Sequence, residues 1–141
     1  MMARKSGRTQ SCGVREARQR LDQARSHLEV ATLVGDTDDA SLEYAGVAAS
    51  VAILGGIAAA DAACCAALKQ RSRSDNHQDA ARLLANIEPG GKAAAAKLSQ
   101  LISLKDTAHY GFLNVSNSQL KKAIRQANHL VGFAEQVVLR T

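Results

Sequence analysis

The sequence predicts an all-α protein, an antiparallel bundle of about five helices. Alanine recurs throughout the chain, there is a single proline, and the aromatic residues are only two tyrosines and two phenylalanines. Apolar residues recur at spacings of three and four, whereas stretches of alternating β-branched residues are missing. This composition and spacing favour helix over strand. A length of 141 residues is typical of one domain.

The first helix is predicted over residues 14–34 and ends at Gly35. One face of it carries Val14, Ala17, Leu21, Ala24, Leu28 and Ala31. The preceding residues 1–13 are basic and polar and lack the apolar core of a secretory signal. We therefore expect a disordered basic arm over residues 1–13 and a single helical domain over residues 14–141.

The second helix is predicted to begin near residue 39 or 42 and to end at residue 69. It is apolar on nearly every side, which is typical of a central helix. Its apolar run is long enough to cross a membrane, but the run consists mainly of alanine and glycine and contains Asp61. We expect a buried helix of a soluble protein, in which Gly55 and Gly56 allow a neighbouring backbone to approach.

Two further helices are predicted over residues 76–87 and 92–109. Asp75 is a candidate N-cap for the first of them. Its end is predicted at the sequence Glu-Pro-Gly-Gly, and Gly111 is a candidate C-cap for the second.

The last helix has the clearest start signal in the chain. Ser116 and Gln119 have the spacing of a capping box, and Val115 and Leu120 occupy the two positions of a hydrophobic staple. Apolar residues then recur at spacings of four and three to the C-terminus. The sequence thus predicts a fifth amphipathic helix.

The charge of the chain is concentrated near its N-terminus. The net charge is +5, and residues 1–25 alone account for it, with seven basic and two acidic residues. Basic clusters favour anionic partners such as nucleic acid. This inference applies to the N-terminal segment, because the charges of the remaining chain cancel.

The three cysteines, Cys12, Cys64 and Cys65, predict no disulfide framework. Their number is odd, and adjacent residues of a helix point about 100° apart, which prevents a bond between Cys64 and Cys65. We therefore expect a reducing, cytoplasmic location. Histidines, cysteines and acids show no metal-ligand spacing, so we expect neither a metal nor another cofactor.

Three ionisable residues interrupt apolar helix faces. Lys105 and His109 lie one turn apart within the apolar stripe of the predicted helix 92–109, and Asp61 lies within that of the second helix. One interpretation is structural, with a buried Asp61–Lys105 ion pair. The other is a cleft in which His109 exchanges a proton, Lys105 holds a phosphate and Tyr110 lies at the rim.

His77 lies in the first turn of the predicted helix 76–87, where a capping or packing role is the simpler interpretation. It also belongs to a set of residues with a recognisable order: a histidine opening a short helix, a Leu-Leu pair, and a basic residue followed by His-Tyr near the end of the next helix. These residues are His77, Leu83, Leu84, Lys105, His109 and Tyr110.

With these motifs, residues 15–139 resemble the HEPN superfamily of small α-helical nucleotide-binding or ribonuclease domains. They look most similar to short actinobacterial members with sequences of the type AADAxCCAxL and LKDxAHYG. The resemblance implies a homodimer with two basic-histidine motifs facing one cleft, metal-independent RNA cleavage in active members, and often a nucleotidyltransferase partner in a toxin–antitoxin pair.

The chain departs from the active members at one point. They place an arginine ahead of the histidine, at the spacing occupied here by Ile102, Ser103 and Leu104. Lys105 is the remaining basic candidate, and lysine lacks the planar fork with which arginine grips a phosphate. The carried-over roles are His109 as general acid or base and Lys105 as electrostatic stabiliser.

Three functions follow as hypotheses. The first is a nucleotide- or RNA-binding HEPN-like module with weakened or absent catalysis, without a membrane partner. The alternative is an active metal-independent endoribonuclease toxin that uses His109 and Lys105. The third is a structural or interaction bundle in which Asp61, Lys105 and His109 form a satisfied core network.

Overall fold

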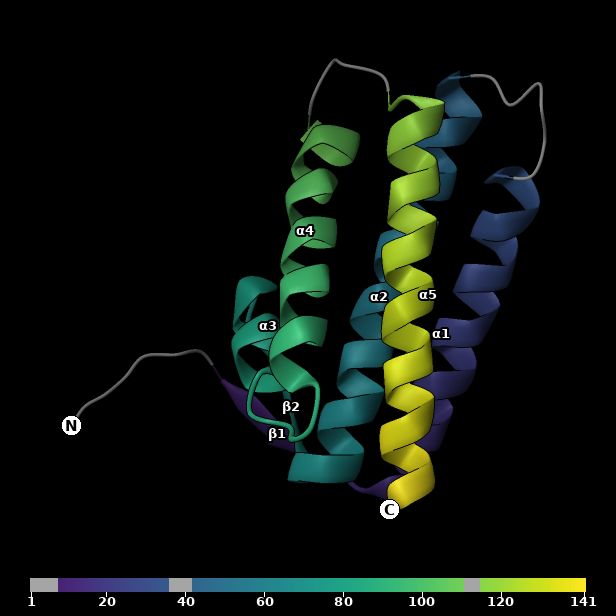
Figure 1. The fold of residues 1–141 in the computed structure, drawn as a ribbon. Helices are drawn as coiled ribbons and strands as arrows, with labels where there is room; N and C mark the ends of the chain where they lie inside the picture. The colour runs from purple at the N-terminus through teal and green to yellow at the C-terminus, as the bar shows by residue number, and fades with distance from the viewer. Residues whose placement is uncertain (1–7, 36–41, 111–114) are drawn as a thin grey trace.

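The computed structural model describes residues 8–35, 42–110 and 115–141, with the backbone alone at residues 42–43 and 106–110. Four long helices run up and down in turn, so that each is antiparallel to the next long helix along the chain, and a short helix packs beside Gly91–Tyr110 (Figure 1). This arrangement confirms the predicted all-α bundle of five helices. The helices are α1 (Val14–Gly35), α2 (Leu42–Leu68), α3 (Gln78–Leu84), α4 (Gly91–Tyr110) and α5 (Asn117–Arg140).

Helix α2 is the central helix, as its composition predicted. It contacts α1, α5, α4 and α3. Its segment Tyr44–Leu68 is, within the described residues, the one helix long and apolar enough to span a membrane by length and composition, and 72% of its most apolar window is buried inside the bundle. That burial is expected of the core helix of a soluble bundle.

The close approach predicted at the Gly-Gly pair is confirmed for Gly55. A Cβ at this position would lie 3.3 Å from the carbonyl oxygen of Ala24 and 3.5 Å from the amide nitrogen of Leu28, both in α1. The backbone of α1 therefore crosses α2 at a distance that leaves little room for a side chain.

The start of α5 also confirms the sequence prediction. The Ser116 hydroxyl accepts a hydrogen bond from the Gln119 amide at 3.0 Å, and the Gln119 side chain accepts one from the Ser116 amide at 2.9 Å. Val115 and Leu120 are both buried in one apolar cluster, as expected of a hydrophobic staple.

Helix α3 is shorter than the predicted range 76–87, and Asp75 is not its cap. The N-cap position is His77, which makes no capping hydrogen bond through its side chain. The Asn76 side chain instead accepts a hydrogen bond from the Gln78 amide at 3.0 Å. At the start of α4, a Cβ on Gly91 would lie 2.5 Å from the carbonyl oxygen of Leu84, so the chain needs glycine there.

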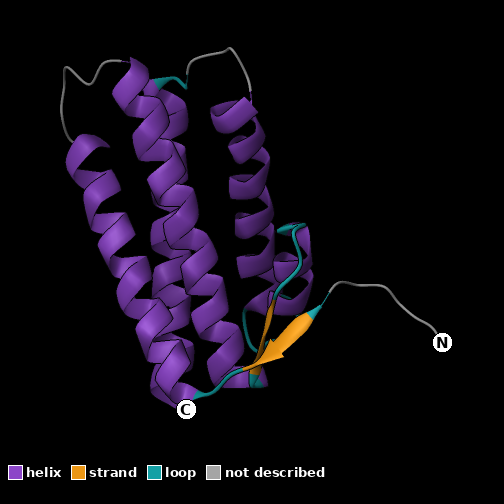
Figure 2. Cartoon of the chain, turned by 180° about the vertical axis from the view of Figure 1, so that it is seen from behind, coloured by secondary structure: helices purple, strands orange, loops and turns teal. Residues whose placement is uncertain are grey.

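A two-stranded antiparallel ribbon, which the sequence did not predict, crosses one end of the bundle (Figure 2). Strand β1 (Thr9–Ser11) pairs with β2 (Gln70–Ser72), and Gln10 lies opposite Arg71. The prediction of a disordered arm over residues 1–13 is therefore wrong for its second half, because backbone pairing orders that segment. Residues 1–7 lie outside the described part of the chain.

Candidate functional site

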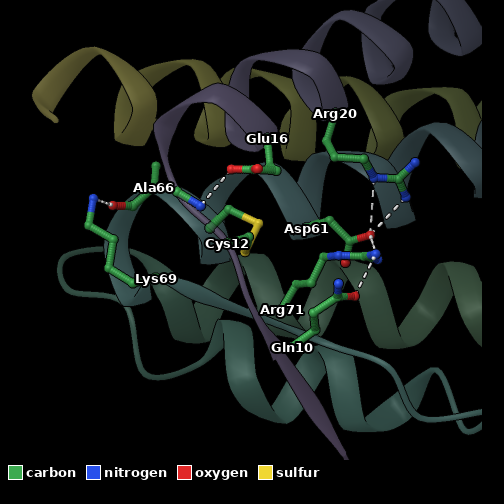
Figure 3. Close-up of a disulfide and its surroundings, with 10 residues drawn as sticks. Gln10, Cys12, Glu16, Arg20, Asp61, Ala66, Lys69 and Arg71 are labelled. Carbon is green, nitrogen blue, oxygen red and sulfur yellow. Dashed lines mark hydrogen bonds and ion pairs between the residues drawn. A yellow bond between two sulfur atoms is a disulfide. The ribbon is translucent and has the colours of Figure 1, made fainter.

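A buried carboxylate is the centre of the candidate site. Asp61 of α2 is only 5% exposed, as its place in the apolar stripe predicted. Its Oδ2 accepts hydrogen bonds from Arg20 Nη2 at 2.7 Å and Arg20 Nε at 3.2 Å (Figure 3). Arg71 Nη1 lies 3.6 Å from the same oxygen. The predicted Asp61–Lys105 pair is therefore wrong, because two arginines occupy the carboxylate.

Local structure explains why these arginines reach Asp61. Arg20 precedes the buried Leu21 and so lies at the edge of the apolar face of α1, which packs along α2. The chain reverses directly after α2 at Lys69, whose φ of 61° is the left-handed conformation common at helix ends. This reversal returns β2 along the end of α2 and brings Arg71 to the carboxylate.

The second partner of Arg71 comes from the N-terminal strand. Arg71 Nη2 donates a hydrogen bond to Gln10 Oε1 at 3.0 Å, so the Arg71 guanidinium connects Gln10 to Asp61 (Figure 3). Burial raises the pKa of the Asp61 carboxyl, and the charges of Arg20 and then Arg71 oppose this rise. The carboxylate is thus held in place by cations on two sides.

The structure contradicts the prediction that no disulfide forms. Cys12 Sγ and Cys65 Sγ are bonded, with their Cα atoms 5.2 Å apart. Cys65 lies one helical turn after Asp61, and Cys12 is placed by a hydrogen bond from its amide to the Lys69 carbonyl at 3.0 Å. The prediction was wrong because it excluded only a bond between the adjacent Cys64 and Cys65. Cys12 was expected to lie in a disordered arm and was therefore not paired with either of them. The expected cytoplasmic location loses this part of its basis and stays a prediction.

His77 and Lys105 belong to the same neighbourhood. Both side chains are half-buried. Burial and then the charge of Lys105 lower the pKa of the His77 imidazole, while Asp61 opposes this shift. Three of the five predicted site residues, Asp61, His77 and Lys105, are thus close enough to interact electrostatically.

Lys105 differs from the two arginines in its contacts. Among the described residues, no hydrogen bond or ion pair joins its side chain to another group. His109 and Tyr110 lie in the last turn of α4, and their side chains are outside the described residues. The predicted roles of these two residues therefore remain predictions.

The charges near Asp61 do not balance. Arg20, Arg71 and Lys105 supply three positive charges, whereas Asp61 and Asp75 supply two negative charges, and the lowered pKa of His77 favours its neutral form. An excess of cations beside partly buried groups favours an anion such as phosphate. In the described ranges, no group of three or more His, Cys, Asp or Glu side chains could hold a metal ion.

Sequence reasoning missed Arg20 and Arg71. Arg71 belongs to the segment RSRS, which has the composition of an exposed loop, yet its side chain is only 34% exposed. Arg20 carried one usable signal, its position next to Leu21 at the edge of an apolar face. Its pairing with Asp61, 41 residues away, has no signature in a single sequence.

A scan against protein-family models finds none that matches this chain, and a search of curated proteins finds no match either.

Proposed function

We propose that the protein is a HEPN-like helical bundle that binds the phosphates of a nucleotide or RNA beside Lys105, with weakened or absent ribonuclease activity. The observation that carries this proposal is the half-buried Lys105 side chain, which lacks an ion-pair partner among the described residues. A partly desolvated ammonium group is stabilised by an anion. Asp61, the buried acid among the described residues, is already bound by Arg20 and Arg71.

The same observation weighs against a purely structural network. That hypothesis required Asp61 to neutralise Lys105, and the carboxylate instead accepts its hydrogen bonds from Arg20. Within the described part of the chain, no other acid pairs with Lys105, which supports an anionic ligand at this position. Arg20 and Arg71 add to the positive potential that attracts polyanions.

Binding of a labelled single-stranded RNA oligonucleotide, followed by fluorescence anisotropy over a range of salt concentrations, tests the proposal. We expect Lys105→Ala to weaken binding and to reduce the slope of log K against log salt by about 0.7, the value for one phosphate contact on a single strand. Lys92→Ala is the matched control, because Lys92 is an exposed lysine in the first turn of the same helix. Equal affinities for the two variants, or no binding by the wild type, would reject the proposal.

One observation favours residual ribonuclease activity as a second candidate. The lowered pKa of the half-buried His77 favours the neutral imidazole, which is the form that accepts a proton. The resemblance gives the corresponding role to His109, with Lys105 stabilising the transition state. Incubation of end-labelled RNA with chelator present should then show cleavage that His109→Ala or His77→Ala abolishes. If the wild-type protein leaves the RNA intact, the ribonuclease candidate is rejected and only the binding function remains proposed.

The remaining expectations of the resemblance are also proposals. A homodimer, a toxin–antitoxin context and a nucleotidyltransferase partner are supported by the motifs named in the sequence. For the dimer, exposed apolar side chains on α1 and α2, including Val30 and Val47, are a further support. Light scattering after gel filtration measures the mass in solution and decides between monomer and dimer.

A further inference from the structure

The N-terminal strand is attached to the bundle by few interactions other than the disulfide. Strand β1 has three residues, all exposed, and forms the edge of a two-stranded ribbon. Next to the ladder, two backbone hydrogen bonds continue the pairing, from the Cys12 amide to the Lys69 carbonyl and from the Arg73 amide to the Arg8 carbonyl. An isolated ribbon of this size is only marginally stable in water. The Cys12–Cys65 bond is therefore the main constraint on residues 8–12.

This weakly attached strand holds one residue of the candidate site. Gln10 Oε1 accepts a hydrogen bond from Arg71 Nη2, while Arg71 Nη1 faces Asp61 at 3.6 Å. Both ends of the Arg71 guanidinium are thus engaged while β1 is in place (Figure 3). Departure of the strand would free the Nη2 donor of Arg71.

The remaining cysteine does not interfere with the disulfide. Cys64 is buried, and burial followed by the charge of Asp61 raises the pKa of its thiol to about 12. A thiol that stays protonated at neutral pH is a poor nucleophile for thiol–disulfide exchange. The Cys12–Cys65 bond therefore has two states, oxidised and reduced, without exchange to Cys64.

We propose that the Cys12–Cys65 disulfide is a redox latch that keeps the N-terminal strand over Arg71 and so limits anion binding at this site. A cellular or added dithiol supplies two electrons and two protons, the S–S bond breaks, two thiols form and the dithiol becomes a disulfide. Residues 8–12 then leave β2, and Arg71 gains a free donor edge for a phosphate. Release of the strand stands by itself, whereas tighter anion binding rests on the proposed function.

Hydrogen exchange measured by mass spectrometry tests the release of the strand without any ligand. Oxidised protein with one free thiol is compared with protein reduced by dithiothreitol, which has three. We expect amides of residues 9–12 and 70–73 to exchange at least about tenfold faster after reduction, while those of α5 are unchanged. Cys64→Ser, which keeps the disulfide, should respond to reduction as the wild type does. Unchanged exchange in the ribbon would overturn the latch.

RNA anisotropy at one salt concentration tests the effect on the site. Reduced protein and Cys12→Ser should bind about tenfold more tightly than oxidised protein, the value of one hydrogen bond to a charged group. Gln10→Ala should give the same gain with the disulfide intact, which covers the case that Cys12→Ser fails to fold. Equal or weaker binding by the reduced form and by Gln10→Ala would overturn the coupling to the site. If no form binds RNA, the proposed function fails, and the exchange experiment still decides the release of the strand.

Discussion

Two arginines of α1 make ion pairs of nearly equal length in different surroundings. Arg20 Nη2 lies 2.7 Å from Asp61 Oδ2, and Arg25 Nε lies 2.8 Å from Glu135 Oε2. The side chain of Asp61 is 7% exposed, whereas that of Glu135 is 43% exposed. Distance alone therefore does not rank these pairs, because the free energy of each depends on what happens to the acid when the arginine is removed.

The surroundings of the two acids explain this difference. Asp61 lies on the central helix, and the ribbon, α1 and the start of α3 surround it. Glu135 lies at the solvent-accessible boundary between α5 and α1, where water solvates its carboxylate if Arg25 is lost. A carboxylate left buried without its partner keeps its desolvation cost, and an exposed carboxylate does not.

Of the two arginine substitutions, Arg20→Met is expected to have the larger effect. We expect this substitution to lower the free energy of unfolding by about 3 kcal/mol at pH 7, because it leaves the buried Asp61 carboxylate with Arg71 alone. Urea denaturation followed by circular dichroism measures the change. A loss below about 1 kcal/mol would show that Arg71 or water compensates for Arg20 fully.

The second prediction removes the disulfide whose Cys65 lies one helical turn from Asp61. Cys12→Ser should lower the free energy of unfolding by about 2 to 4 kcal/mol, because the disulfide closes a long loop between residues 53 apart in the chain. If residues 8–12 then leave β2, Arg71 loses its contact with Gln10 and water reaches Asp61 more readily. Arg20→Met should consequently cost less in the Cys12→Ser background than in the wild type, and a double-mutant cycle measures the difference. Strict additivity would contradict this account.

The third prediction concerns pH. Because burial raises the pKa of Asp61 in the folded protein, the folded state binds the proton more tightly than the unfolded chain does. The contribution of Asp61 to stability therefore increases as the pH falls through the folded pKa toward the ordinary value of 3.8. Compared with Asp61→Asn, which cannot titrate, the wild type should gain stability between pH 7 and pH 4. A relative loss would mean that the arginines, rather than burial, set this pKa.

The smallest effect is expected from Arg25→Met, the same substitution on the same helix. Its two acidic neighbours, Glu135 and Asp22, are exposed, so we expect a loss below about 1 kcal/mol that shrinks further in high salt. Urea midpoints at low and high salt provide the measurement. A loss as large as that of Arg20→Met would remove the distinction between the two pairs.

Much of the fold could be predicted because its signals are local. Helix α1 follows from apolar residues at spacings of three and four, and α5 from a capping box whose hydrogen bonds are present. The burial of Asp61 followed from its position in an apolar stripe. Each of these inferences needed only a short stretch of sequence.

The contacts that build the site join distant parts of the chain, and the sequence did not reveal them. Cys12 and Cys65 are 53 residues apart, and Arg20 and Asp61 are 41 apart. The two strands have three polar residues each and lack the alternation that identifies strands in a sequence. The positions of Asp61 and Lys105 within apolar helix faces predicted that both side chains point inward. They did not identify Arg20 and Arg71 as the partners of Asp61.

The segment of α2 around Asp61 is built almost entirely of alanine. Its buried alanines are Ala58, Ala59, Ala60, Ala62, Ala63 and Ala66. Alanine has no rotamers to lose when it is packed, so ordering this segment costs almost no side-chain entropy. The separation between α2 and its neighbours is thereby set by methyl groups and backbone atoms. Because this separation is short, one arginine from α1 and one from the surface ribbon both reach a single oxygen atom of Asp61 inside the protein.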